Sequence, residues 1–229
     1  MTRDVFVMLM TAGLSAGVSL PVVWWLLRLE AQRRERLQAW AARRGWSFAP
    51  RAAEAGMDVT LWQLPLFRRH SRPTIPATTG ITNVMHGTVG AQDVWIFDMR
   101  YSAGESSTAL TLAAWPVAGR TLPAFEWRHQ SIVLGLEATL DGLDWQDVPL
   151  GNAGATDVPY RLRSSVPAAA QALFARPSVI AFFREHADWD VEGAGSWLLI
   201  YPRARTRVAP EGLDRWLERV AAVQALVSQ

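Results

Sequence analysis

The pattern of hydrophobic and polar positions divides the chain into a long apolar run and a mixed remainder. The run from Val5 to Leu27 holds 23 residues without a charge. A helix of that length measures about 35 Å, and the hydrocarbon core of a bilayer is about 30 Å thick. Trp24 and Trp25 close the run, where aromatic side chains are typical of a membrane interface. The pattern predicts a transmembrane anchor over residues 1–27.

A cleaved signal peptide would have a shorter apolar region and a small-x-small cleavage site, whereas bulky residues fill the end of this run. We therefore expect a retained anchor. Within it, Gly13 and Gly17 have the spacing that lets two membrane helices approach closely. They are candidates for a homodimer contact; the alternative is that they are ordinary small residues of a membrane helix.

Arginines are concentrated after the run, while only Arg3 precedes it. This asymmetry predicts the inner membrane of a bacterium, with the N-terminus outside and the domain in the cytoplasm. Residues 28–45 read as a basic juxtamembrane helix that ends at Gly45. Arginines here and in a later patch are candidates for lipid headgroup contact, the alternative being solvated charge. They are Arg28, Arg33, Arg34, Arg36, Arg68, Arg69 and Arg72.

Residues 46–229 form the predicted cytoplasmic domain. After a short strand at residues 46–48, the proline-containing segment 51–79 has no stable period and is predicted to be rich in loops. A period of two then predicts three strands with short connections, over residues 81–89, 93–101 and 108–115. Such strands form an antiparallel meander. The core face of the middle strand carries Trp95, Phe97, Met99 and Tyr101.

The C-terminal half mixes both periods. Strands are expected at residues 124–128, 158–163, 189–191 and 196–201, while residues 136–150 stay ambiguous. Helices are expected at 167–174 and 177–186, each beginning with proline, and at 210–227. The apolar stripe of the last helix is predicted to pack on the sheet, the alternative being a partner helix. The predicted fold class is α+β, a transmembrane helix followed by an antiparallel sheet covered by helices.

The order of these features resembles a bacterial family. The resemblance rests on the anchor, the basic helix ending in Arg44-Gly45-Trp46, and a series of short motifs, which are Asn83 with Gly87, Phe97-Asp98 with Tyr101, Val158 to Arg163, Val191-Glu192-Gly193 and Trp197-Leu198-Leu199. The family comprises single-pass membrane-anchored proteins with a cytoplasmic domain of unknown function, common in high-GC species. The resemblance implies an intact anchor and an α+β domain, without a catalytic residue to transfer.

Composition narrows the chemistry. All 23 basic residues are arginine and there is no cysteine, which removes Schiff-base and P-loop lysine chemistry, disulfides and thiolate metal sites. The four histidines lack a zinc spacing, so neither a metal nor a cofactor is expected. Carboxylates cluster twice, and like charges so aligned are expected to face water. The clusters are Asp141, Asp144 and Asp147, and Asp188, Asp190 and Glu192.

These observations favour a non-catalytic interaction module that presents its domain at the inner membrane surface to the bilayer or a protein partner, and not to nucleic acid. The alternative is a hydrolase-like enzyme of the membrane surface that uses carboxylates with His86 or His129. A polar patch of Asp98, Arg100, Glu126 and Arg128 is expected only if their strands are neighbours.

Overall fold

The computed structural model describes residues 3–70, 80–103, 106–129, 144–150 and 160–228. Within these residues, nine strands form one sheet in the order β1-β2-β3-β4-β9-β8-β5-β7-β6, and every pair is antiparallel. The strands are β1 (Ser47–Arg51), β2 (Ile81–Val89), β3 (Gln92–Ala103), β4 (Ser106–Pro116), β5 (Leu122–His129), β6 (Gln146–Asp147), β7 (Tyr160–Ser164), β8 (Trp189–Gly195) and β9 (Trp197–Pro202). The α+β class and the large antiparallel sheet are confirmed.

The helices, including two 3₁₀ turns, are α1 (Arg3–Arg43), α2 (Ala52–Ala55), η1 (Val59–Gln63), α3 (Pro65–His70), α5 (Pro167–Phe174), α6 (Pro177–Glu185), η4 (Pro210–Gly212) and α7 (Leu213–Ser228). Helices α5, α6 and α7 lie where the sequence predicts them. The meander of β2, β3 and β4 is also confirmed, with Met99 opposite Ile81 on one side and Leu110 on the other.

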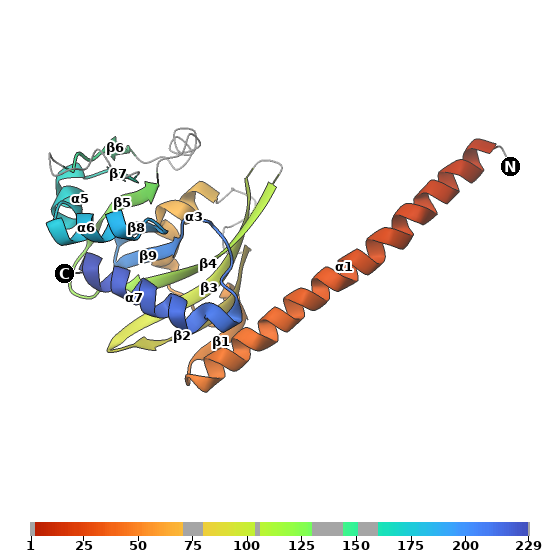
Figure 1. Ribbon diagram of the computed structural model, residues 1–229, viewed down its shortest axis with the longest axis horizontal. Helices are drawn as coiled ribbons and strands as arrows, with labels where there is room; N and C mark the ends of the chain where they lie inside the picture. The colour runs from red at the N-terminus through yellow and green to blue at the C-terminus, as the bar shows by residue number, and fades with distance from the viewer. Residues whose placement is uncertain (1–2, 71–79, 104–105, 130–143, 151–159, 229) are drawn as a thin grey trace.

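Helix α1 leaves the domain as a single long rod, with the N-terminus at its far end (Figure 1). The helix ends at Arg43, and Gly45, the expected terminator, adopts φ 69° just beyond it. The Trp46 amide donates to the Ala41 carbonyl and the Gly45 amide to the Ala42 carbonyl, the paired bonds of a Schellman cap. Within the described part of the chain, no helix combines the length and the apolarity needed to cross a membrane.

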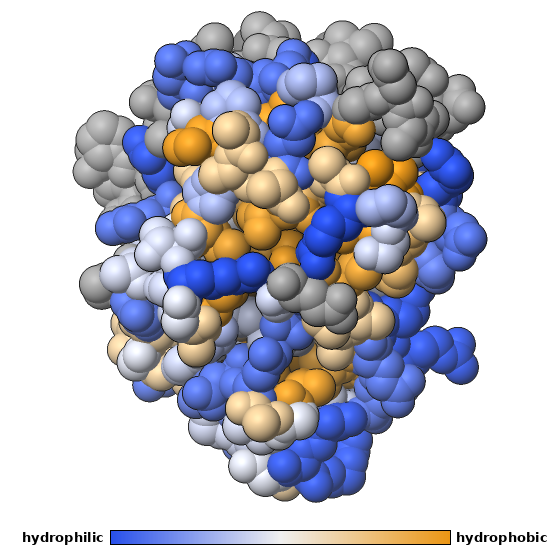
Figure 2. Space-filling view, turned by 90° about the vertical axis from the view of Figure 1, so that its left-hand side faces the viewer, coloured by the Kyte–Doolittle hydropathy of each residue, from blue (hydrophilic) through white to orange (hydrophobic). Residues whose placement is uncertain are grey.

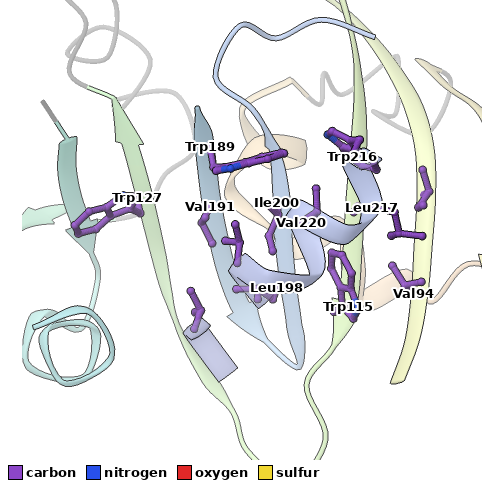
Figure 3. Packing of buried hydrophobic residues seen from close by; sticks show 14 of the residues in the cluster. Val94, Trp115, Trp127, Trp189, Val191, Leu198, Ile200, Trp216, Leu217 and Val220 are labelled. Atoms are coloured by element: carbon purple, nitrogen blue, oxygen red, sulfur yellow. The ribbon is translucent and has the colours of Figure 1, made fainter. Parts of the chain in front are cut away.

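Helices cover both faces of the sheet. On one face, α7 lies across the strands and buries Trp216, Leu217 and Val220 against Trp115 and Ile200 (Figure 3). The prediction that its apolar stripe packs on the sheet is confirmed. The C-terminal end of α1 and helices α5 and α6 complete this layer. The first core is therefore enclosed between the sheet and the longer helices.

The opposite face is covered by residues 52–70, where the sequence predicts loops. This expectation is wrong for the described residues, since α2, η1 and α3 form an ordered layer over the sheet. Leu61, Leu64 and Phe67 are fully buried there against Phe97 and Leu112. These helical pieces are too short to establish a helical period, so their burial is decided by the sheet they cover. Residues 71–79 lie outside the described residues.

Figure 2 shows the end of the domain away from α1. Apolar residues gather at the centre of this face and charged residues surround them. Leu173 of α5 and Phe182 of α6 are partly buried against the first core. The domain thus has two distinct ends, one joined to α1 and one formed by the C-terminal elements.

Gly87 in β2 permits a close approach that another residue would obstruct. A Cβ at this position would lie 2.3 Å from ring atoms of Trp46. We expect Gly87→Ala to lower the free energy of unfolding by about 2 kcal/mol, because the buried Trp46 ring must shift. Urea unfolding followed by tryptophan fluorescence measures this change.

Gly212→Ala is the matched control, since its Cβ would meet only a Val208 methyl at 3.9 Å. Equal stability of the Gly87→Ala and Gly212→Ala proteins would contradict the close approach.

Candidate functional site

Asp98 joins α1 to the sheet. This carboxylate is only 3% exposed, and it accepts hydrogen bonds from Arg33 Nε and Nη2, each at 2.9 Å. The Thr111 hydroxyl donates at 2.7 Å and the Asn83 amide at 3.0 Å. Arg33 also donates to the Val208 carbonyl at 2.7 Å. A two-pronged, charge-assisted pair of this kind fixes both position and orientation, so α1 is held to β3 at one defined register.

Asn83 sits at an irregular point of β2. Its φ is 54°, and the register of β2 against β3 shifts between Thr82 and Met85. Because Nδ2 donates to Asp98, the amide orientation is fixed and Oδ1 points elsewhere. Oδ1 is buried and has no hydrogen-bond partner among the described residues. An unpaired buried acceptor and a left-handed backbone at one residue both cost stability, a combination typical of functional sites.

Beside Asp98 and Asn83 lies a cavity of about 350 Å³, which we call the junction pocket. It opens between α1, the start of β2 and the middle of β3. Its charged lining comes from Glu30, Arg34, Asp98, Arg100 and Arg207, and Leu27 forms an apolar wall. The size falls within the range of small-ligand sites.

The junction pocket has an excess of positive charge. Asp98 is neutralised by Arg33, and Glu30 is the carboxylate that faces the other arginines. Glu30 pairs with Arg207 at 2.7 Å and with Arg100 at 3.4 Å. The Arg34 side chain is exposed and makes no ion pair or hydrogen bond within the described residues. Chemically, the pocket is suited to an anion.

A second group of charges is enclosed under α3, on the opposite face of the sheet. We call it the buried ionic cluster; its members are Arg69, Glu126, Arg128, Arg163, Asp190 and Glu192. Arg69 donates to Glu126 and, at 2.5 Å, to Glu192. Glu192 also accepts from the Tyr201 hydroxyl at 2.7 Å and the Leu66 amide at 2.7 Å. The cluster therefore fastens α3 to the sheet.

The charges of this cluster balance, with three arginines facing three carboxylates. Desolvation raises the pKa of Glu126, but the charges of Arg69 and Arg128 outweigh it and hold that pKa below its usual range. A carboxylate held ionised by arginines is a poor proton donor or acceptor near neutral pH. The arrangement therefore supports a structural role for these groups.

Asp190 departs from this pattern, since burial raises its pKa to about 6 against the opposing charge of Arg128. Its proton is bound more tightly in the folded chain, so the stability it contributes is full below pH 3.8 and is lost as the pH rises through 6. From pH 5 to pH 8 this loss is about 1 kcal/mol.

Asp190→Asn should remove that part of the pH dependence, because the amide oxygen can still accept from the His129 amide. Urea unfolding at both pH values measures it. Asp188→Asn, at an exposed ion pair with Arg219, is the control and should retain the wild-type pH dependence. An unchanged slope in the Asp190→Asn protein would contradict the assignment.

The structure separates the arginines predicted to contact headgroups. Arg69 is buried in the ionic cluster and Arg33 is held by Asp98, so neither guanidinium can reach a membrane. Arg36 pairs with Glu211, while Arg28 lies 5.2 Å from the Trp24 ring. Arg34 and Arg68 are exposed. Arg72 falls outside the described residues, and the surroundings of Val5, Gly13 and Gly17 are likewise not described.

The expected polar patch does not form. Asp98 and Arg100 lie on β3, which is separated from the β5 strand of Glu126 and Arg128 by β4, β9 and β8. Alternation along the strands also places Asp98 and Glu126 on opposite faces of the sheet. The sequence shows which residues alternate along each strand but not the order of the strands in the sheet. The patch required β3 and β5 to be neighbours, and they are not.

The prediction that the clustered carboxylates face water holds for Asp144, Asp147 and Asp188, which are exposed, but not for the other two described members. Asp190 and Glu192 do not face water; they are buried opposite arginines. Asp147 pairs with Arg161, whereas Asp141 lies outside the described residues. Among the described residues, no three histidine or acidic side chains converge as metal ligands would.

His86 and His129 stand far apart in the sheet, on β2 and β5. His86 stacks on Trp95 with ring centres 4.0 Å apart. His129 packs edge-on against Tyr160. His86 Nε2 also lies 3.7 Å from the exposed Asp93 carboxylate. The two histidines therefore belong to different parts of the sheet and do not share one site.

Comparisons with protein-family models, curated proteins and solved structures return no match for this chain. The functional argument therefore rests on the chain's own geometry.

Proposed function

We propose that this protein is a single-pass, membrane-anchored interaction module that holds its α+β domain at the cytoplasmic surface of a bacterial inner membrane. The anchor is the uncharged run from Val5 to Leu27, and the neck is the basic helix that follows it. The resemblance to a family of membrane-anchored proteins supports the anchor. The distribution of arginines supports an N-terminus outside the cytoplasm.

One observation carries the proposal. Where side chains of α1 are described, its apolar residues before Arg28 are largely exposed: Val22, Trp24 and Leu27 are 50%, 60% and 65% exposed. Ten residues further on, Leu37 and Trp40 of the same helix are buried in the first core. An exposed apolar surface of this kind marks a contact with a membrane or another molecule. Because it continues directly into the uncharged run, the bilayer is its natural partner.

A non-catalytic role is supported by the state of the ionisable groups. The carboxylates of the buried ionic cluster are opposed by arginines or shielded from solvent, and His86 stacks on Trp95. A domain held at the cytoplasmic surface of the membrane is placed to bind a protein partner on that side.

Membrane fractionation with an alkaline carbonate wash tests the anchor, using full-length chain with a C-terminal fluorescent fusion. We expect the protein in the washed membrane pellet, and a fluorescent fusion because the C-terminus is cytoplasmic. Leu14→Arg should move a large share into the soluble fraction, since an arginine at the centre of a membrane helix costs about 3 kcal/mol.

Leu14→Ile, which keeps the apolar character, is the matched control and should remain in the pellet. Recovery of the wild-type protein in the soluble fraction would overturn the proposal. Proximity labelling from the C-terminus, with the Leu14→Arg protein as reference, then identifies partners that require the membrane address.

A further inference from the structure

We propose that the junction pocket binds the headgroup of one anionic glycerol phospholipid, of the phosphatidylglycerol type. The inference rests on the proposed membrane anchor and deepens it by naming a ligand class and a site. Three features of the pocket carry it: its depth relative to the anchor, its surplus of arginine, and the unpaired acceptor of Asn83.

The first feature is the position of the pocket along α1. Leu27, the last residue of the uncharged run, lines it, and so do Glu30 and Arg34 on the next two turns of the helix. Seven residues of helix rise about 10 Å. The headgroup layer on each side of the hydrocarbon core is about 5–8 Å thick. A helix leaving the bilayer after Leu27 therefore carries the pocket at headgroup depth, with its apolar wall toward the acyl chains.

The second feature is charge. Arg34, Arg100 and Arg207 line the pocket and Glu30 opposes them, while Asp98 is already neutralised by Arg33. An anion bound between them would gain bidentate, charge-assisted hydrogen bonds from the guanidinium groups, as phosphates do at arginine sites. Arg34, whose guanidinium has no ion-pair or hydrogen-bond partner in the described part of the chain, has free donors for such an anion.

The third feature selects among anionic lipids. Asn83 lines the pocket and is 97% enclosed, with Oδ1 lacking a donor among the described residues. Such an acceptor is satisfied by a hydroxyl group of a ligand. A phosphodiester that also carries glycerol hydroxyls supplies both the anion for the arginines and the donor for Asn83. Phosphatidylserine has the same net charge, but its headgroup donor is an ammonium group, whose positive charge the arginines of the pocket would repel.

The test uses the full chain in a neutral detergent, with native mass spectrometry counting bound lipid as dioleoyl phosphatidylglycerol, phosphatidylserine or phosphatidylcholine is added. We expect one phosphatidylglycerol per chain, bound about tenfold more tightly than phosphatidylcholine. Arg34→Gln should remove most of this preference. Arg34 makes no side-chain contact that folding needs, so this variant should unfold at the wild-type urea concentration.

Arg36→Gln is the matched control, since Arg36 lies on the same helix and pairs with Glu211 outside the pocket. It should bind phosphatidylglycerol as the wild type does. Asn83→Gly, which suits the positive φ, should keep the preference for anionic lipids but lose the preference for phosphatidylglycerol over phosphatidylserine. Equal losses in the Arg34→Gln and Arg36→Gln proteins would overturn the site in favour of diffuse charge attraction.

Two further measurements show whether the lipid assignment, the pocket or the anchor is at fault if the expected binding is not seen. If deacylated glycerophosphoglycerol competes as well as the intact lipid, the ligand is a soluble phosphodiester and the lipid assignment is overturned. A chain that stays in washed membranes but binds phosphatidylglycerol no better than phosphatidylcholine refutes the pocket alone. A chain that binds the lipid in detergent but is soluble in cells refutes the anchor and supports the pocket.

Discussion

Replacing Arg69 with methionine is expected to lower the free energy of unfolding by about 3–5 kcal/mol, the cost typical of breaking a buried ion pair. Arg69 is held between Glu126 and Glu192, and its side chain is only 1% exposed. Methionine fills a similar volume but leaves two buried carboxylates with less compensating charge. Urea unfolding of the full chain in neutral detergent, followed by tryptophan fluorescence, measures the loss.

The neighbouring residue provides the control for this prediction. Arg68 is exposed on the same helix, so Arg68→Met should change stability by less than about 0.5 kcal/mol. A second variant, Glu192→Gln, keeps the shape of the side chain but removes its charge, and should also destabilise because Arg69 then lacks one of its two partners. If Arg69→Met and Arg68→Met behaved alike, the ionic cluster would not be what fastens α3 to the sheet.

The buried ionic cluster also shows where sequence reasoning stops. In β5, β7 and β8 the charged residues alternate with apolar ones, a pattern that usually indicates a strand with one wet face. Here the charged face is covered by α3, and the signs are complementary: Glu126 and Glu192 face Arg69. The missed signal is this complementarity between distant segments, together with the position of Arg69 just after the apolar stretch that ends at Phe67.

Local signals were sufficient for much of the fold. The meander, helices α5 and α6 with their initial prolines, and the Gly45 cap depend on neighbours within a few residues, which the sequence displays directly. The strand order is a different matter. The pairing of β4 with β9 joins Ala114 to Leu199, which are far apart in the sequence, and periodicity carries no information about such a pairing.

The junction pocket was visible in the sequence only in fragments. Asn83 and Asp98 belong to the motifs on which the family resemblance rests, and Arg34 was among the candidate headgroup residues. The sequence does not show that these residues lie together. The hydrogen bond from Arg33 to Asp98 brings α1 against β3, and the cavity lies between these two elements. A position with φ 54° at Asn83 has no sequence signature beyond the tolerance of asparagine for that region.

The second large effect is expected at this link. Asp98→Ala should lower the free energy of unfolding by about 3 kcal/mol, since it leaves the part-buried Arg33 without its carboxylate. Thr111 and Asn83 lose an acceptor in the same step. The loss should stay near the lower limit for buried pairs because the Arg33 side chain is 13% exposed and water can partly replace its partner.

Glu211→Ala is the matched control, because it breaks the pair between Arg36 and Glu211 on the same helix, where both side chains are more than 60% exposed. Such a surface pair contributes less than about 1 kcal/mol. Hydrogen exchange adds a spatial readout: Asp98→Ala should increase exchange in α1 after Arg28 and in β3, while α7 keeps its protection. Uniform loss of protection would mean that Asp98 supports the whole domain, whereas a loss confined to α1 and β3 would establish it as the joint that fixes the domain to the neck.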